Sequence, residues 1–369
     1  MQHNLSMANS KKMSIVSSKV PIGFLLAMLY LVISFFGIQQ LLVPKYQTKL
    51  IEGALPGEYY KEKIRHDVIF LGDCEIYSNI SPITLYRQYG ISSFLRATSS
   101  QTLWQSYYFL EEIFSYETPQ IVVLSISAMT EGSAVSEAYN RLNFDNMRWS
   151  SSKYRSIKAS MTEQETYLSY LLPLLRYHSR WSQLSSEDFS YYFSSPEVSH
   201  SGYLMRSDIN PLDTLPAVRV LADYEFPDIC FEYLDRIKQL CDSHGARLIL
   251  MKAPSVYPHW HEQWDLQIRE YADANNLFYY NFIELNDDIG IDMSTDSYDM
   301  GLHLNIYGAE KLSSYIGLIL SVQYQLPDCR NDPYISVIYD KKIADYDLMF
   351  SEQKREWEAD KSLSIDKKD

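Results

Sequence analysis

The chain has 369 residues, of which 46% are hydrophobic and 22% charged, and its formal net charge is −14 at pH 7. This balance is typical of a folded globular protein and excludes wholesale disorder. So acidic a chain is a poor partner for nucleic acid or for an anionic membrane surface, and a neutral partner such as an uncharged glycan fits better.

Residues 20–44 contain no charged side chain and form the first predicted element, a transmembrane anchor. A bilayer crossing takes about 20 apolar residues, and this run is long enough. Lys11, Lys12 and Lys19 precede it, so the positive-inside rule predicts a cytoplasmic N-terminus (residues 1–19) and an extracytoplasmic body. A cleaved signal peptide is the main alternative, although no small-x-small cleavage pattern follows the apolar run; a buried core helix is another.

The body is predicted to alternate strands and helices after a polar stalk at residues 45–66. Five short apolar runs have the composition of buried parallel strands: residues 67–72, 92–98, 119–127, 246–254 and 277–282. Helical spacing occurs at residues 100–116, 227–244, 259–275 and 305–324, and another helix is expected after Ser81, a predicted N-cap, with Pro82 in its first turn. This order predicts a parallel, doubly wound three-layer α/β sandwich over residues 67–325.

Two segments depart from this alternation. Residues 128–225 are rich in Ser, Tyr, Arg and Trp, with one apolar helix expected around 165–177, and they are too long for a plain loop. We interpret them as an inserted subdomain. Residues 176–181 within it fit either a sugar-binding surface or an interior polar network. Residues 326–369 are expected to form a charged C-terminal tail with an exposed helix around 346–361.

Three polar segments are predicted to meet where ligands bind in such folds, at the carboxyl ends of the strands. They are residues 72–82, 97–105 and 295–312. Cys74 lies in the first, and Asp299 and His303 lie in the last. A nucleophile, an imidazole that takes its proton and a carboxylate that orients the imidazole are the parts of a hydrolytic triad. The order along the chain therefore indicates hydrolytic or acyl-transfer chemistry.

These segments resemble the SGNH, or GDSL-type, hydrolase family. In that family a strand ends in Gly-Asp-Ser, whose Ser is the nucleophile, and Asp-x-x-His precedes the last helix. Here Gly72-Asp73-Cys74 and Gly301-Leu302-His303-Leu304-Asn305 match these two blocks, and the resemblance covers about residues 67–319.

More narrowly, the chain resembles the membrane-anchored, extracytoplasmic members of Gram-positive bacteria, some of which transfer O-acyl groups to surface polysaccharides beside a membrane-embedded acyl exporter. The resemblance implies a flavodoxin-like fold and an esterase or O-acyltransferase that acts on glycan esters or acylated small molecules. It also implies a location on the cell membrane.

The match departs from the family pattern at the triad. Cys74 stands where the family has Ser, so it is either a thiol nucleophile or a small buried residue of a non-catalytic member. Asp299 is one residue further from His303 than the family spacing, so a bulge is needed to aim it at the imidazole. Asp296 is the alternative carboxylate.

The resemblance assigns further oxyanion donors to a Gly after the second strand and an Asn after the third. Ser99-Ser100-Gln101 occupies the first position, and no Asn follows the third strand. We expect the backbone N–H of Ser100, beside Gln101, to serve as a donor, with an ordinary N-cap as the alternative role of Ser100. Lys252, at the end of the fourth strand, binds either an anionic substrate group or a neighbouring acid.

Neither a metal nor another cofactor is expected. The four cysteines include no C-x-x-C pair, and the sequence has no P-loop and no G-x-G-x-x-G. His259 and His261 do not share a helix face, and Cys230 and Cys241 lie too far apart on one predicted helix to form a disulfide. The competing function is that of an inactive SGNH-fold protein that binds or scaffolds surface-glycan machinery.

Overall fold

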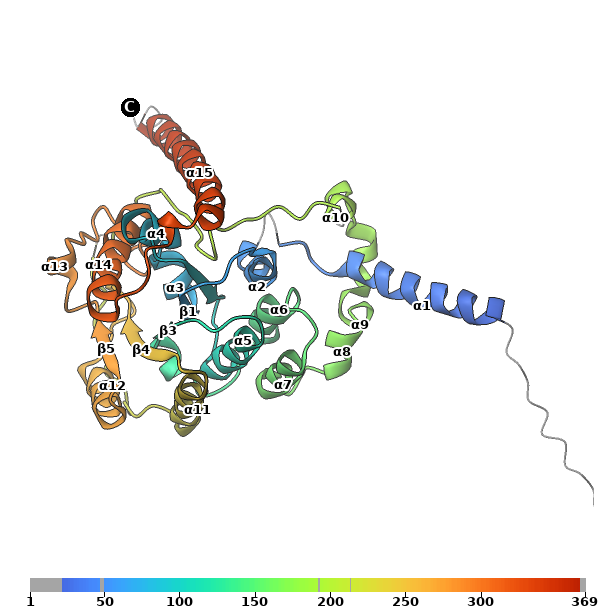
Figure 1. Cartoon of the computed structure of the whole chain (residues 1–369), viewed down its shortest axis with the longest axis horizontal. Coiled ribbons are helices and arrows are strands. Elements are labelled where there is room, and N and C mark those ends of the chain that lie inside the picture. Colours follow the sequence, from blue (N-terminus) through green and yellow to red (C-terminus); the bar gives the residue numbers. More distant parts are fainter. Residues whose placement is uncertain (1–21, 47–49, 192, 213, 366–369) are drawn as a thin grey trace, which may run out of the picture.

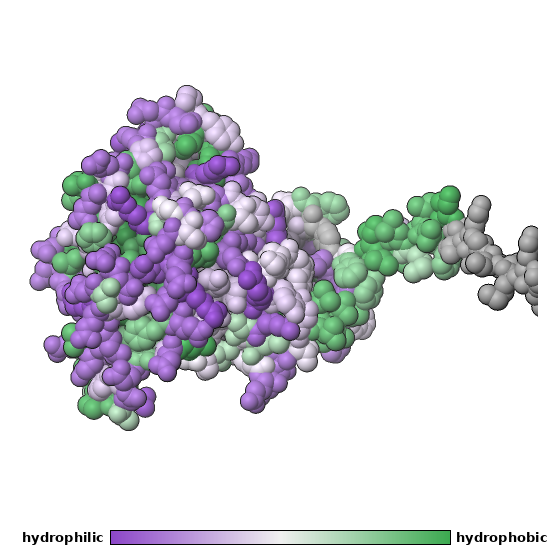
Figure 2. All heavy atoms as spheres, turned by 60° about the horizontal axis from the view of Figure 1, so that its bottom comes forward, coloured by the Kyte–Doolittle hydropathy of each residue, from purple (hydrophilic) through white to green (hydrophobic). Residues whose placement is uncertain are grey.

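The computed structural model describes residues 22–46, 50–191, 193–212 and 214–365. The expected cytoplasmic segment (residues 1–19), the first two residues of the expected anchor, residues 47–49 of the expected stalk and the last four residues of the tail lie outside it. Figure 1 shows the arrangement of the chain, and Figure 2 shows one face of the molecule.

A five-stranded parallel sheet forms the centre of the body, in the order β2-β1-β3-β4-β5. The strands are β1 Val68–Gly72, β2 Ser93–Ala97, β3 Ile121–Ser125, β4 Arg247–Lys252 and β5 Phe278–Asn281. This is the flavodoxin-like order, and it confirms the predicted α/β fold class. The first three strands are buried along their whole length, because helices cover both faces of the sheet.

Helices form the two outer layers (Figure 1). One face is covered by α3 Cys74–Asn79, α4 Pro82–Tyr89, α14 Ile306–Tyr324 and α15 Pro333–Ile365; the other is covered by α5 Leu103–Tyr116, α11 Asp228–His244 and α12 Glu262–Asn275. Ser81 caps α4 as expected, by accepting the N–H of Thr84 at 3.2 Å. By contrast, α5 begins after Thr102 and not at Ser100, because Thr102 and Gln105 form a reciprocal capping box.

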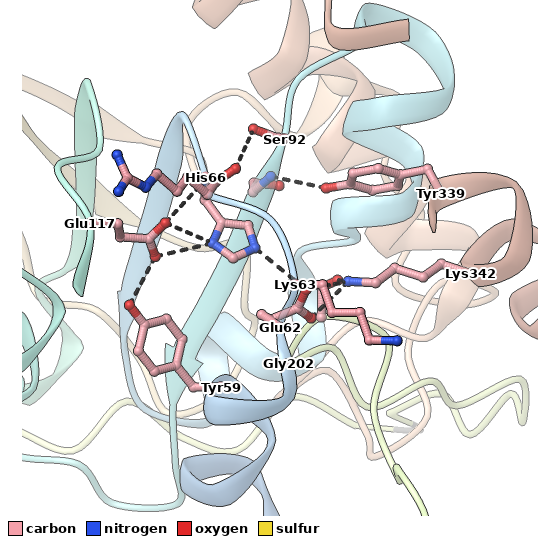
Figure 3. Close-up of polar contacts among 12 residues, drawn as sticks. Tyr59, Glu62, Lys63, His66, Ser92, Glu117, Gly202, Tyr339 and Lys342 are labelled. Atoms are coloured by element: carbon pink, nitrogen blue, oxygen red, sulfur yellow. Dashed lines mark hydrogen bonds and ion pairs between the residues drawn. The ribbon is translucent and has the colours of Figure 1, made fainter. Parts of the chain in front are cut away.

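Residues 50–66 pack against the body, so the expectation of a polar stalk is wrong for them. They form η1 Ile51–Ala54, α2 Leu55–Glu58 and η2 Tyr59–Lys61. Figure 3 shows His66 between two acids: its Nδ1 lies 3.1 Å from Glu117 Oε1, and its Nε2 lies 3.7 Å from Glu62 Oε2. Lys342 of α15 reaches the same Glu62 at 2.7 Å. These contacts join the N-terminal segment, the end of α5 and the C-terminal helix.

The described part of the segment predicted as an insertion contains a series of short helices. It holds η3 Ser127–Thr130, α6 Glu137–Phe144, α7 Ser151–Ser160, α8 Tyr167–Leu171, α9 Leu174–Tyr177, η4 His178–Gln183 and α10 Ser186–Ser190. α6 and α7 extend the core next to α5 through Phe144 and Ile157. The single helix expected at residues 165–177 is broken, because Pro173 forces Leu172 out of the helical region (φ −119°, ψ 86°).

The C-terminal segment is part of the core and not an exposed tail. η5 Cys329–Asn331 follows α14 and leads into α15. The short helix α13 Asn286–Ile289 lies earlier, between β5 and α14. Tyr339 and Tyr346 are fully buried, and the Tyr339 ring stacks on Tyr86 with a centroid distance of 3.6 Å. The expected short exposed helix is therefore only the distal part of α15.

One helix of the described residues is long and apolar enough to cross a membrane: α1 Ile22–Leu42. It projects away from the body, and nearly all its side chains are exposed until its last turn (Figures 1 and 2). This agrees with the predicted anchor, whereas the side of the membrane on which the body lies stays a prediction. All four cysteines are free thiols, and Cys230 and Cys241 share α11 as expected.

Candidate active site

Cys74 lies at the carboxyl end of β1, in the first turn of α3. The register pairs Gly72 with Ala97 of β2, and Leu71 with Leu124 of β3, so the ends of these three strands meet at one edge of the sheet. In the flavodoxin-like order, the β1/β3 position is the switch point at which ligands bind. The half-buried Cys74 therefore lies where the fold places its chemistry.

The sharp turn from β1 into α3 requires glycine at position 72. Gly72 has φ +152°, and a Cβ there would lie 2.7 Å from Ser125 Cβ and 2.8 Å from Ile76 Cγ1. Asp73 then caps α3 by accepting the N–H of Glu75 at 3.0 Å. The structure thus explains why Gly72 and Asp73 precede Cys74.

The Asp299 and His303 side chains form a hydrogen-bonded pair. His303 Nδ1 lies 2.6 Å from Asp299 Oδ2, and Asp299 Oδ1 accepts the backbone N–H of His303 at 2.7 Å. The bulge that the spacing required is present, because Met300 (φ 64°) and Gly301 (φ 83°) are both left-handed. Asp296, the alternative acid, is buried and pairs with Lys311 at 2.6 Å.

The second nitrogen of the His303 ring faces no partner among the described residues. Nε2 is buried and makes no hydrogen bond, so the structure holds no bond between it and the Cys74 sulfur. The Tyr298 ring lies parallel to the imidazole at 5.9 Å between centroids, and Arg206 sits 5.0 Å above Tyr298. With Asp299 fixing Nδ1, Nε2 is the atom left to exchange a proton.

Negative charge surrounds the Cys74 thiol. Burial raises its pKa well above the ordinary value, and the carboxylates of Asp73 and Glu75 raise it further. Burial and the charge of Glu75 also raise the pKa of Asp73 to about 6. The resting thiol is therefore protonated at neutral pH, which differs from a thiolate–imidazolium pair.

Lys252 lies inside the body and is paired with an acid. Its Nζ lies 2.5 Å from Glu75 Oε1 and donates to Ser255 Oγ at 3.2 Å. Glu75 contacts Ser125 Oγ at 3.5 Å, which in turn lies 3.1 Å from Ser127 Oγ. Of the two roles considered for Lys252, pairing with an acid is the one that the geometry supports.

Ser100 and Gln101, in the loop after β2, have different roles in the structure. Ser100 has a left-handed backbone (φ 51°), the conformation that glycine adopts readily, and it is not the N-cap of α5. In the described chain neither its N–H nor that of Cys74 donates to another residue. Gln101 is buried, and its Nε2 donates to Arg96 O and Ser106 Oγ. Gln101 therefore braces the loop, whereas the Ser100 N–H stays available.

Sequence reasoning missed several residues that shape the site. Asp73 accepts a hydrogen bond from Ser127 Oγ at 2.8 Å, and Tyr298 contacts Ser78 Oγ at 3.2 Å. Asn79 Oδ1 accepts the N–H of Leu304 at 2.8 Å, which fixes the residue after His303. Asp73, Ser78 and Asn79 lie within residues 72–82, and Tyr298 adjoins Asp299, so their position in the two matched segments is the signal that points to them.

A cavity of about 370 Å³ opens beside the site. Tyr77, Ser78 and Tyr298 line one side of it, and Arg206, Met205 and Met349 line another. A second hollow of about 210 Å³ surrounds His66 at the opposite, amino-terminal edge of the sheet. The first cavity adjoins the site through Tyr298, whose ring stacks on His303, whereas Cys74 and His303 do not line it.

No family model matches the chain, and no curated protein sequence matches it. Solved structures similar to it at low identity include the following two. A GDSL-like lipase from Bacteroides thetaiotaomicron has a TM-score of 0.34 and 12% identity, over 70% of this chain and 88% of that one. A proposed acylhydrolase from Bacteroides fragilis has a TM-score of 0.37 and 11% identity, over 72% of this chain and 94% of that one. Similarity at this level assigns no function to this chain.

Proposed function

We propose that this chain is a membrane-anchored, extracytoplasmic esterase or O-acyltransferase of the SGNH type that acts on ester groups of cell-surface or exopolysaccharide glycans. The observation that carries the proposal is the Asp299–His303 pair, whose unpartnered Nε2 is buried at the sheet edge where Cys74 begins α3. The apolar helix α1 is the anchor. A membrane-embedded acyl exporter is the partner that would supply an acyl donor.

In the proposed reaction the Cys74 sulfur attacks the ester carbonyl carbon while its proton passes to His303 Nε2. The N–H groups of Cys74 and Ser100 stabilise the oxyanion. The C–O bond then breaks, and His303 returns the proton to the leaving alkoxide, which leaves a thioester on Cys74. Water or a sugar hydroxyl attacks the thioester and gives its proton to His303. The C–S bond breaks, the free acid or the sugar ester leaves, and the released Cys74 thiolate takes the proton from His303.

Esterase assays on the full chain test this mechanism. Cys74→Ala and His303→Ala are expected to lower the rate of hydrolysis of acetylated sugars and of nitrophenyl acetate by at least about 10⁴-fold, as loss of a triad member does. Cys74→Ser is expected to keep part of the activity, and wild type is expected to show an acetyl adduct on the Cys74 peptide by mass spectrometry.

Matched controls are Cys329→Ala and His259→Ala, which change a half-buried thiol and an exposed imidazole outside the site. They are expected to act as wild type does. Equal activity of Cys74→Ala, His303→Ala and wild type on every donor would sink the proposal.

A non-catalytic role is the second candidate, and one observation favours it. The described structure has no hydrogen bond from His303 to the Cys74 sulfur, and the thiol pKa is raised. In that role the cavity beside Tyr298 would bind a glycan without cleaving it. Absence of any acetyl adduct, together with calorimetric binding of an acetylated oligosaccharide that Tyr298→Ala abolishes, would support this role over catalysis.

A further inference from the structure

The last turn of α1 is embedded in the segment predicted as an insertion. Leu42 and Val43 pack against Tyr177 and Leu184. The Arg180 guanidinium donates to the backbone oxygen of Leu42 at 2.7 Å, which is a favourable place for a cation because it lies at the carbonyl end of a helix. α9 and η4 are therefore fixed to the end of α1.

This attachment sets the height of α9 and η4 relative to a bilayer. Gln39 is buried and accepts the N–H of Leu174 at 3.2 Å, so the exposed part of α1 covers residues 22–38. Such a stretch is roughly 25 Å long at about 1.5 Å per residue. The hydrocarbon layer is about 30 Å thick. This stretch covers most of the hydrocarbon layer, so whatever packs against α1 at Gln39 lies close to the boundary between hydrocarbon and headgroups when α1 spans the membrane.

Large apolar side chains are exposed at this level. Figure 2 shows hydrophobic residues on the end of the body from which α1 departs. The exposed apolar side chains of α8, α9, η4, α10 and the residues after α10 have these exposed fractions: Leu168 56%, Leu175 53%, Trp181 72%, Phe189 51% and Phe193 93%. Trp concentrates at membrane interfaces because its ring is amphipathic, and Phe and Leu occupy the apolar face of segments that lie in the interface.

The two arginines of this segment are paired with acids of the protein. Arg176 meets Glu137 at 2.7 Å, and Arg180 meets Asp188 at 3.0 Å. Contact with a membrane therefore rests on the apolar and aromatic side chains, which suits a chain whose net charge of −14 disfavours anionic lipid.

We propose that α8, α9, η4 and α10 form a juxtamembrane surface that lies in the headgroup region of the leaflet around α1 and fixes the orientation of the body on the membrane. The proposal depends on the role of α1 as the anchor. It also accounts for residues 176–181: Tyr177 and Arg180 hold α1, and Trp181 faces lipid, in place of a sugar site.

Fluorescence quenching by brominated lipid tests the surface. The full chain, with six Trp, is reconstituted in phosphatidylcholine vesicles that contain phosphatidylcholine brominated near the headgroup end of the acyl chains. Wild type is expected to show a quenched component that Trp181→Phe removes. Trp264→Phe is the matched control, because Trp264 lies in α12 on the far side of the body from α1 (Figure 1), and it is expected to keep the component.

Each outcome assigns the failure to one part of the proposal. Equal quenching of wild type and Trp181→Phe, in a chain that resists alkaline carbonate extraction, overturns the lipid-facing surface and leaves a protein as the occupant of this face. Release of the chain by carbonate overturns the anchor and the surface together. Neither outcome bears on the esterase assays, which depend on Cys74 and His303.

Discussion

At the scale of single residues, the charges beside Cys74 decide how it could react. Asp73 and Glu75 flank the thiol, and among the described residues Glu75 forms an ion pair with Lys252 whereas Asp73 forms none. A protonated thiol must lose its proton during attack, so His303 has to act as a general base at that moment. In this respect the proposed mechanism resembles that of a serine nucleophile more than that of a preformed thiolate.

Asp73→Asn is expected to lower the pKa of the Cys74 thiol, because it removes the charge that raises this pKa more than Glu75 does. A lower pKa gives a larger fraction of thiolate at any pH below it, and therefore faster reaction with an electrophile. Alkylation of Cys74 by iodoacetamide, followed against pH in a Cys329→Ser background, measures the change. The control Asp242→Asn changes a distant exposed carboxylate on α11, and an Asp73→Asn profile that coincided with it would contradict the prediction.

The same substitution is expected to change stability. Asp73 has a folded pKa of about 6 against an ordinary 3.8, so the folded state binds more protons between these values. The free energy of unfolding therefore falls as pH rises through this range, by at most about 3 kcal/mol for a pKa difference of this size. Urea unfolding in detergent solution at pH 5 and pH 8 measures the effect. The free energy of unfolding of Asp73→Asn, relative to that of wild type, should be higher at pH 8 than at pH 5. The same difference between the two proteins at both pH values would contradict the prediction.

At the scale of elements, the loop before α14 holds the Asp299–His303 pair. Gly301 N–H donates to Ser297 Oγ at 2.7 Å, and its carbonyl accepts the N–H of Val256 at 2.7 Å. Met300 N–H donates to the Asn210 carbonyl at 2.8 Å. The two left-handed residues between Asp299 and His303 are thus fixed from both sides, which keeps the carboxylate on the imidazole.

Substitutions at these two positions should have opposite effects. Met300→Gly removes an exposed side chain from a residue with φ 64° and should be neutral or stabilising by up to about 1 kcal/mol. Gly301→Ala should destabilise by about 1–3 kcal/mol, since φ is 83° and the new Cβ would lie 3.0 Å from Val256 Cβ. Urea unfolding compares the two, and esterase activity should fall only in Gly301→Ala. Equal stability of both variants would refute this account of the loop.

At the scale of the whole molecule, His66 joins three distant parts of the chain (Figure 3). Burial lowers its pKa, but hydrogen bonds and charges of Glu117 and Glu62 outweigh burial, and the net pKa is raised above 6.5. Lys342 and His66 in turn hold the pKa of Glu62 down to about 2, against the effect of burial. The cluster links the segment before β1, the end of α5 and α15.

The stabilisation from charged His66 is complete below its unfolded pKa and is lost as pH rises through the raised folded pKa. The loss amounts to about 1.4 kcal/mol for each pH unit that separates the two pKa values. Wild type should therefore lose unfolding free energy as pH rises above 6.5, whereas His66→Gln should be less stable at pH 6.5 and lack this decline. The exposed control His244→Gln should behave as wild type. Urea unfolding over a series of pH values measures both, and a parallel decline in His66→Gln would show that another group is responsible.

Much of the architecture could be predicted because it depends on local pattern. Each strand lies within its predicted range, since runs such as residues 68–72 are apolar and end in turn residues. Pro173, which breaks the helix expected at residues 165–177, is a local signal of the same kind. The burial of residues 50–66 and of Tyr339 was not predictable, because charged neighbours mask the apolar side chains whose partners lie far away in the chain.

By itself the sequence determined the alternation of strands and helices, the uncharged helix α1 and the position of Cys74 after a strand, because each depends on neighbouring residues. Only the tertiary structure decided that Asp299 rather than Asp296 meets His303, that Lys252 neutralises Glu75, and that α9 and η4 hold the end of α1. Lys252 and Glu75 are 177 positions apart, and their contact arises from the pairing of strands and not from any local preference.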